Sequence, residues 1–192
     1  MRARNMAIVA VVLALALPAI AAAPVPRASP ELTIVDSDGH AVSLSSFKGQ
    51  VVVLEFLLVR CARCLQTAQT VNKLYDELGD AGFRPIGVAF DDGIGEPAIR
   101  GLAEILKINY LVGYTTSDKV DGYLGRALME RFQVPQVVVI DRAGMIRAQS
   151  HPTGEVDLTD ESYLRNLVRD LLNEGAPPGN TEKMTYAPGT AR

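Results

Sequence analysis

Residues 51–64 read VVVLEFLLVRCARC. This apolar run ends in Cys61 and Cys64, which are the only two cysteines in the chain. The run shows too little alternation for a strand with one face in water, and it fits a central strand that is covered on both sides. From Cys64 onward, apolar residues recur at helical spacing. The two cysteines therefore mark the point where a buried strand changes to a helix, and Glu55 is the one acidic residue in that strand.

The rest of the chain alternates between strand and helix patterns around this junction. The expected elements are strands at 32–35, 41–44 and 51–58, a helix at 64–78, a strand at 84–90, a helix from 96, a strand at 111–114, a helix at 120–132, strands at 137–140 and 145–149, and a last helix capped by Asp157 or Thr159. Strands separated by helices imply a parallel core, and the hairpin at 135–149 adds an antiparallel edge. The sequence therefore predicts an α/β protein, a three-layer α/β/α sandwich with a mixed sheet and an N-terminal β-hairpin.

The N-terminal residues have the pattern of a secretory signal peptide. Arg2 and Arg4 precede an apolar run at 6–20, and small residues follow through Ala23. The run is short for a membrane span, although an uncleaved N-terminal anchor remains an alternative. We expect residues 1–23 to be removed on export.

The remaining chain divides by composition into three parts. Residues 24–30 are rich in proline and alanine and predict a linker, and residues 31–174 are expected to form one domain. Residues 175–192 have few apolar anchors and predict a disordered tail.

Charge and cysteine count exclude several classes of protein. The formal net charge is −3, and loss of Arg2 and Arg4 with the signal makes the domain more acidic. An acidic domain of this kind lacks the net positive charge with which proteins bind nucleic acid or an anionic membrane. A zinc site would need two ligands beyond the cysteines, and the chain offers only His40 and His151. We therefore expect no metal and no cofactor.

The spacing of Cys61 and Cys64 points to redox chemistry. Positions i and i+3 at a helix start place both sulfurs on one face, close enough to bond. The helix N-terminus, Arg60 and Arg63 all favour a thiolate at Cys61 and lower its pKa. A disulfide that closes so short a loop is a poor staple, because it constrains the unfolded chain very little. Cys64, one turn deeper, is suited to resolve a mixed disulfide.

Two further residues are candidates for the site. Burial of Glu55 in an apolar strand should raise its pKa, which suits proton exchange with a nearby thiol. Alternatively, Glu55 faces an accessible edge or pairs with Lys48 or with an arginine. Pro135 directly precedes a buried strand, where a trans proline would simply start the strand. A cis Val134–Pro135 bond would instead present the backbone to a partner, and the residues alone leave this open.

Together these segments resemble the thioredoxin superfamily, and within it the exported TlpA/ResA-like thiol–disulfide oxidoreductases with an AhpC/TSA-redoxin-like domain. The matching segments are LTIVDSDG at 32–39, VSLSSFKG at 42–49, residues 51–56, the cysteine pair at 61–64, Val134-Pro135 and the turn at 141–144. The order and spacing of the whole set carry the resemblance.

The resemblance implies a role for each site residue. Cys61 would be the nucleophile and Cys64 the resolving thiol of a redox-active disulfide. Pro135 would be cis, the backbone at Val134 would dock a partner, and Glu55 matches a buried acid that many thioredoxins have. The implied setting is the bacterial periplasm, where a monomer would act on client proteins with thiols or disulfides, and a membrane thiol carrier would be a further partner.

Departures from the family pattern leave other functions to consider. Arg60 stands where the family usually has Trp, and Arg63 where Pro is common, so we expect a more oxidising disulfide than in thioredoxin. A peroxiredoxin-like peroxidase is one alternative, although Leu54 and Leu58 replace the Pro and Thr expected before its cysteine. A Sco-like copper chaperone is another, although it would use CxxxC and a distal histidine, and His151 does not match that position.

Overall fold

A computed structural model describes residues 23–126, 133–150 and 157–174 of the chain. Outside these residues lie the expected signal peptide up to residue 22, residues 127–132, His151 and the C-terminal tail. The helix expected at 120–132 instead spans Ser117–Leu124, because Gly125 takes a left-handed conformation and caps it. Within the described part of the chain, no helix is long and apolar enough to cross a membrane.

The described residues form one mixed sheet of eight strands, in the order β1-β8-β7-β4-β5-β6-β2-β3. The strands are β1 (Arg27–Ala28), β2 (Thr33–Asp36), β3 (Ala41–Ser43), β4 (Val51–Leu57), β5 (Phe83–Ala89), β6 (Leu111–Tyr114), β7 (Gln136–Ile140) and β8 (Met145–Gln149). Strands β4, β5 and β6 run parallel, and all other neighbours pair antiparallel. The parallel core with antiparallel strands on both sides confirms the predicted mixed sheet.

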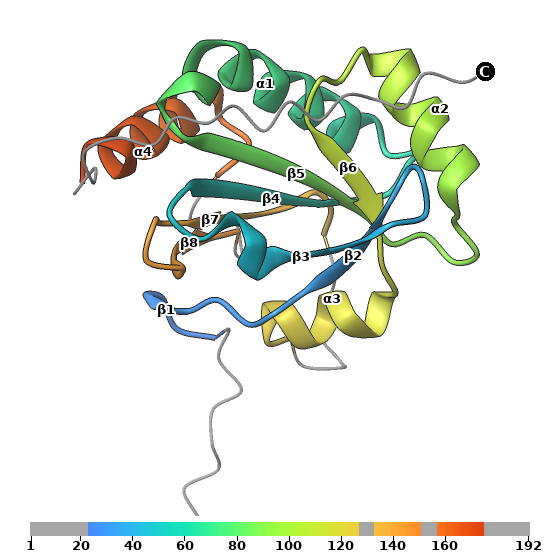
Figure 1. Ribbon diagram of the computed structural model, residues 1–192, viewed down its shortest axis with the longest axis horizontal. Helices are drawn as coiled ribbons and strands as arrows, with labels where there is room; N and C mark the ends of the chain where they lie inside the picture. The colour runs from blue at the N-terminus through green and yellow to red at the C-terminus, as the bar shows by residue number, and fades with distance from the viewer. Residues whose placement is uncertain (1–22, 127–132, 151–156, 175–192) are drawn as a thin grey trace, which may run out of the picture.

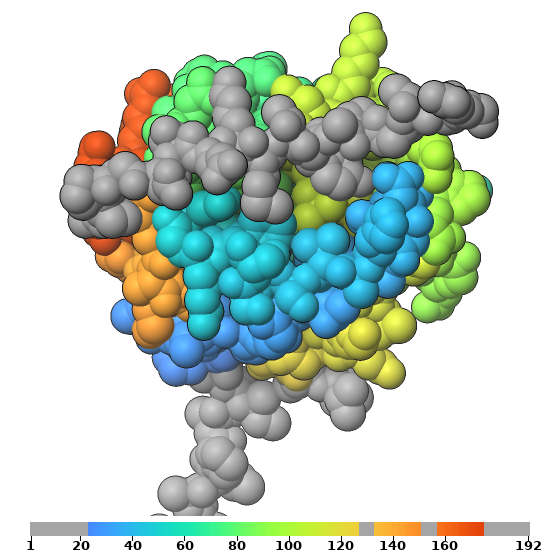
Figure 2. Space-filling model, in the orientation of Figure 1, coloured from blue at the N-terminus to red at the C-terminus, as the bar shows by residue number. Residues whose placement is uncertain are grey.

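Helices cover both faces of the sheet (Figure 1). They are α1 (Ala62–Leu78), α2 (Glu96–Leu106), α3 (Ser117–Leu124) and α4 (Glu161–Asn173), with short 3-10 turns η1 (Leu44–Phe47) and η2 (Gly79–Ala81). Helices α1, α2 and α4 pack on one face of the sheet, and α3 packs on the other. Figure 2 shows the blue and cyan N-terminal segments spread over the face turned to the viewer. The predicted three-layer sandwich is therefore confirmed.

Strand β4 lies at the centre of the sheet between β7 and β5, and every one of its residues is buried. Its side chains alternate between two hydrophobic cores, as the pleat of a strand requires. Val53 and Leu57 join the core beneath α1, α2 and α4, whereas Leu54 and Phe56 join the core on the α3 side. By the same alternation, Glu55 points into the core beneath α1.

Some elements differ from the sequence-based expectations. Part of the segment predicted as a linker forms β1, which pairs with β8 through Arg27 and Ile146. The last helix is capped by Asp160, whose side chain accepts the Tyr163 N–H, and not by Asp157 or Thr159. Both differences arise in segments too short or too polar to carry a hydrophobic period.

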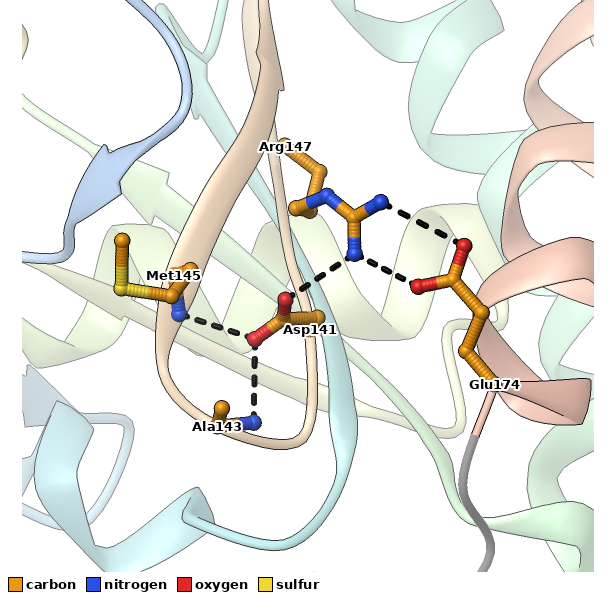
Figure 3. A network of polar contacts seen from close by, with 5 residues as sticks. All are labelled: Asp141, Ala143, Met145, Arg147 and Glu174. Atoms are coloured by element: carbon orange, nitrogen blue, oxygen red, sulfur yellow. Dashed lines mark hydrogen bonds and ion pairs between the residues drawn. The ribbon is translucent and has the colours of Figure 1, made fainter.

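The turn between β7 and β8 is fixed by a polar network (Figure 3). Asp141 Oδ1 accepts the backbone N–H groups of Ala143 and Met145, each at 2.9 Å. Arg147 donates to Asp141 Oδ2 at 3.1 Å and to both carboxylate oxygens of Glu174 at 2.6 and 3.3 Å. This network attaches the end of α4 to the hairpin.

A second anchor lies in the same turn. The guanidinium of Arg142 donates to the carbonyls of Gly49 at 3.0 Å, Ala81 at 3.1 Å and Leu172 at 3.3 Å. These carbonyls precede β4, precede β5 and end α4, respectively. One side chain therefore joins three segments at the end of the sheet where β4 begins.

Candidate active site

The cysteine pair lies at the other end of β4, where α1 begins. Cys61 is the N-cap of α1, with extended backbone angles of φ −88° and ψ 110°, and its Sγ accepts the Cys64 N–H at 3.2 Å. The two residues form a disulfide, with their Cα atoms 5.2 Å apart. Cys61 is half-buried, whereas Cys64 is 0% exposed. The accessible sulfur is therefore that of Cys61, and Cys64 lies behind it.

The two charged side chains beside Cys61 at the start of α1, Arg60 and Arg63, are both positive. The first turn of α1 has no acidic residue, so no negative side chain in that turn reduces the positive potential at the helix N-terminus. Arg60 and Arg63 are both exposed. Arg63 also acts on Asp157: hydrogen bonds from Thr159 chiefly lower the pKa of the Asp157 carboxyl, and the charge of Arg63 lowers it further. Arg63 therefore shares its charge with Asp157, whereas the sequence argument gave it to Cys61 alone.

Glu55 is buried in β4 on the face that carries Cys64. It is 1% exposed, and neither carboxylate oxygen has a hydrogen-bond partner among the described residues. Burial raises its pKa well above the usual value of 4.5. Tyr110 lies close enough for the charge of Glu55 to act on it: burial raises the pKa of the Tyr110 hydroxyl, and Glu55 raises it further. The same hydroxyl donates to the Ala68 carbonyl in α1 at 3.3 Å. The surroundings favour a protonated, neutral acid beneath α1.

The alternative settings for Glu55 are not found. It does not face an accessible edge, and it forms no ion pair with Lys48 or with an arginine in the described part of the chain. The expected rise in its pKa is confirmed. Its role in proton exchange stays a prediction.

Pro135 lies at the same end of the sheet as the cysteines. Gln136, the first residue of β7, pairs with Phe56 near the end of β4, and this register places Pro135 close to the start of α1. The Val134–Pro135 peptide bond is cis, as the resemblance implies. Pro135 is buried, and Val134 and Cys61 both pack against the core beneath α1.

Comparison with known proteins identifies the family. The model of the AhpC/TSA family matches residues 25–149. The chain belongs to this family. Its fold is that of the thioredoxin superfamily.

Similar proteins come from two groups. A chloroplastic peroxiredoxin Q of Suaeda salsa is 30% identical over 137 residues, which cover 68% of this chain and 63% of that protein. The peroxiredoxin Q of Oryza sativa subsp. japonica is 39% identical over 66 residues, or 34% of this chain and 30% of that protein. The chain thus matches less than two thirds of the length of these relatives.

Solved structures provide the second group. A thiol:disulfide interchange protein from Bacteroides sp. is 27% identical with a TM-score of 0.62, covering 80% of this chain and 92% of that one. A thiol:disulfide interchange protein of the thioredoxin family from Chlorobium tepidum TLS has a TM-score of 0.62 at 20% identity, covering 77% and 97%. The second of these likenesses concerns the fold alone.

The AhpC/TSA domain offers no metal centre within residues 23–126, 133–150 and 157–174. No group of three or more His, Cys, Asp or Glu side chains there is placed to hold an ion. His151, the histidine considered for a copper site, lies outside these residues. The other histidine, His40, lies in the β2–β3 turn, where its Nδ1 is 3.5 Å from Oδ2 of the buried Asp36.

One residue near the site was missed by the sequence argument. Asp91 follows β5, and its Oδ2 accepts the backbone N–H of Val59 at 3.0 Å. The signal that could have found it is positional, because β5 is parallel to β4 and both strands end at the same edge of the sheet. An acidic residue two positions after the end of β5 therefore comes close to the segment that leads to Cys61.

Proposed function

We propose that this protein is an exported thiol–disulfide oxidoreductase that exchanges disulfides with partner proteins. The observation that carries the proposal is the Cys61–Cys64 disulfide at the start of α1, with Cys61 half-buried and Cys64 fully buried. Family membership and the similarity to a thiol:disulfide interchange protein at 27% identity support it. The signal-peptide pattern of residues 1–23 supports export, with the bacterial periplasm as the proposed location.

The proposed reaction begins with the reduced pair. The Cys61 thiolate attacks one sulfur of a client disulfide, forming a mixed disulfide and releasing the other client sulfur as a thiolate. Cys64 then loses its proton and attacks Cys61 Sγ, which releases the second client thiolate and leaves the Cys61–Cys64 disulfide. Two electrons pass from the cysteine pair to the client. Run in reverse, the same steps oxidise a client dithiol.

Four features of the site assist these steps in our proposal. The Cys64 N–H and the α1 dipole stabilise negative charge on Cys61, because both direct partial positive charge at its sulfur. Glu55 exchanges a proton with Cys64 from within the core beneath α1, directly or through water. The backbone at Val134, next to the cis bond, pairs with the client chain. A membrane thiol carrier is the proposed partner that resets the redox state of the pair.

The decisive test is trapping of clients. A Cys64→Ser variant expressed in the native host should accumulate mixed disulfides, because the resolving thiol is absent, and reductant should release the clients for identification. The Cys61→Ser/Cys64→Ser variant is the matched control and should trap nothing. If Cys64→Ser holds no client, the oxidoreductase proposal is contradicted.

The redox potential provides a second test. Arg60 favours the thiolate and hence the reduced form, so we expect the pair to be more oxidising than thioredoxin at about −270 mV. Equilibration with glutathione measures this directly. A potential at or below the thioredoxin value would contradict the expectation.

A peroxidase is the second candidate, favoured by the 30% identity to a peroxiredoxin Q. In that reaction the Cys61 thiolate attacks a peroxide oxygen, giving a sulfenic acid and water or an alcohol. Cys64 then displaces a second water and forms the disulfide. Single-turnover consumption of hydrogen peroxide that persists in Cys64→Ser but is lost in Cys61→Ser would support this candidate. If both variants consume peroxide as the wild type does, Cys61 is not the peroxidatic residue and this candidate is excluded.

A further inference from the structure

The segment that leads into Cys61 is held by the residues that follow β5. Three hydrogen bonds fix it: Phe90 N–H to Leu57 O at 3.3 Å, Val59 N–H to Asp91 Oδ2 at 3.0 Å, and Cys61 N–H to Leu58 O at 3.0 Å. The first two reach across more than thirty residues of sequence, and only the third is local. In the bond at Val59 the acceptor is a side chain, the Asp91 carboxylate, whereas the other two bonds join backbone groups.

This attachment matters most when the disulfide is open. In the oxidised protein, the bond to Cys64 holds Cys61 in its capping position. After reduction, that position depends on the segment 58–60, on the backbone bond from the Leu65 N–H to the Cys61 carbonyl at 3.0 Å, and on the contact between Cys61 Sγ and the Cys64 N–H at 3.2 Å. A hydrogen bond from an N–H to a carboxylate is stronger than one to a neutral acceptor. The Asp91–Val59 bond therefore holds the segment before Cys61 whether the pair is oxidised or reduced.

We infer that Asp91 is a positioning residue for the reaction: its carboxylate holds the Val59 amide and so keeps the reduced Cys61 sulfur at the N-cap of α1. The inference rests on the proposed function, since it assigns a role in the same site. Asp91 acts through the backbone and does not touch the reacting sulfur.

The charge and the hydrogen bond of Asp91 have opposite effects on Cys61. The negative charge near the site disfavours a thiolate, whereas the hydrogen bond favours it by keeping the sulfur at the positive end of the helix. The charged and titratable groups on the elements around the pair are Arg60 and Arg63 at the start of α1, Glu55 in β4, Asp91 and Asp92 after β5, Tyr110 before β6, and Asp157 before α4. Substitutions at position 91 can separate the two effects.

Three variants make the separation. Asp91→Asn keeps an oxygen that can accept the Val59 N–H but removes the charge, Asp91→Ala removes both, and Asp92→Asn is the matched control one residue away. The measurement is the rate of Cys61 alkylation by iodoacetamide against pH in the reduced Cys64→Ser background. It reports thiolate formation even if the protein has no disulfide-exchange activity, so its outcome is independent of the proposed function.

We expect the pH midpoint of alkylation to fall by about half a pH unit in Asp91→Asn and to rise by about half a unit in Asp91→Ala. Asp92→Asn should stay within about 0.2 unit of the parent. Equal downward shifts in both Asp91 variants would reduce the role of Asp91 to its charge and overturn the inference. Unchanged midpoints, with or without a loss of stability, would overturn it as well.

If Asp91→Ala does not fold, Asp91→Ser replaces it, because the shorter hydroxyl cannot span the distance to the Val59 N–H. Thermal unfolding of otherwise native Asp91→Ala or Asp91→Ser should show a larger loss of stability in the reduced than in the oxidised protein. An equal loss in both redox states would show that Asp91 only supports the fold.

Discussion

Asp141, beside the start of β4, and Glu55, near its end, are acidic side chains in opposite settings. Where the strand begins, the Asp141 carboxylate accepts hydrogen bonds from two backbone N–H groups and from Arg147. Beside it, the Arg142 guanidinium donates to three backbone carbonyls. Where it ends, the Glu55 carboxyl is buried with no hydrogen-bond partner in the described part of the chain. A buried polar group without a partner lowers stability, and such groups gather at sites of chemistry. We infer that Asp141 serves the fold, whereas Glu55 serves the cysteine pair.

The largest expected effect tests whether the reactive end is where function lies. Cys61→Ser should reduce disulfide exchange to the rate seen without protein, because no nucleophile remains at the accessible position. Insulin reduction by the variant, with dithiothreitol as the electron source, measures this. Activity retained in Cys61→Ser would place the chemistry elsewhere.

At the other end, Asp141→Ala should affect stability and leave chemistry unchanged. The variant loses an acceptor for Ala143 and Met145 and a partner of Arg147, so the free energy of unfolding should fall by about 1–3 kcal/mol. Urea denaturation gives the free energy, and the alkylation rate of Cys61 is the internal control. A change in that rate would show that the two ends are coupled, and the division drawn above would fail.

Glu55→Gln should make the protein more stable, and increasingly so as the pH rises. Burial raises the pKa of Glu55 in the folded protein above 4.5, so the folded state holds this proton more tightly than the unfolded state. That stabilisation is complete below pH 4.5 and is lost as the pH rises toward the folded pKa. The wild type should therefore lose up to about 1.4 kcal/mol per pH unit relative to Glu55→Gln over that range.

Urea denaturation of both proteins between pH 4 and pH 9 measures this difference. A constant offset between the two curves would mean that Glu55 titrates normally in the folded protein. Slower resolution of a mixed disulfide in Glu55→Gln, measured in the same samples, would connect the buried acid to Cys64.

The smallest effect is expected at an exposed ion pair between the two helices that cover the Cys64 face. Arg165 of α4 bonds Glu77 of α1 and also Glu161, and Glu77 is 42% exposed. Glu77→Gln should shift the urea midpoint slightly at low salt and not at all at 0.5 M salt, because exposed pairs are screened. A shift that persists at high salt would mean that this pair supports the helix packing more than its exposure suggests.

The sequence was most informative where a hydrophobic period exists. The apolar runs of β4, β5 and β7 and the helical spacing after Cys64 were enough to predict the layers, the mixed sheet and the junction that carries the cysteines. The same pattern favoured the burial of Glu55, but it left an accessible edge or an ion pair open as alternatives.

Contacts between distant segments were not predictable in this way. The bond from Val59 to Asp91 spans 32 residues and involves one side chain, so no local pattern announces it. Strand β1 has two residues, too few for any period, and its pairing with β8 depends on an edge that exists only in the folded sheet. The sharing of Arg63 with Asp157 likewise arises only when the start of α4 comes beside α1.

The side chain of Arg142 also has a consequence for the order of folding. Its three carbonyl partners lie 93, 61 and 30 residues away along the chain, so each bond closes a long loop. The loop-closure entropy of all three must be met before the guanidinium is satisfied, and none of these bonds can form early. We therefore expect the hydrogen bonds of Arg142 to form late in folding, after the segments that carry the three carbonyls have come together. Because Leu172 is one of its partners, fraying of the last turn of α4 would cost Arg142 one of its three carbonyl bonds, while the bonds to Gly49 and Ala81 keep it attached to the segments before β4 and β5.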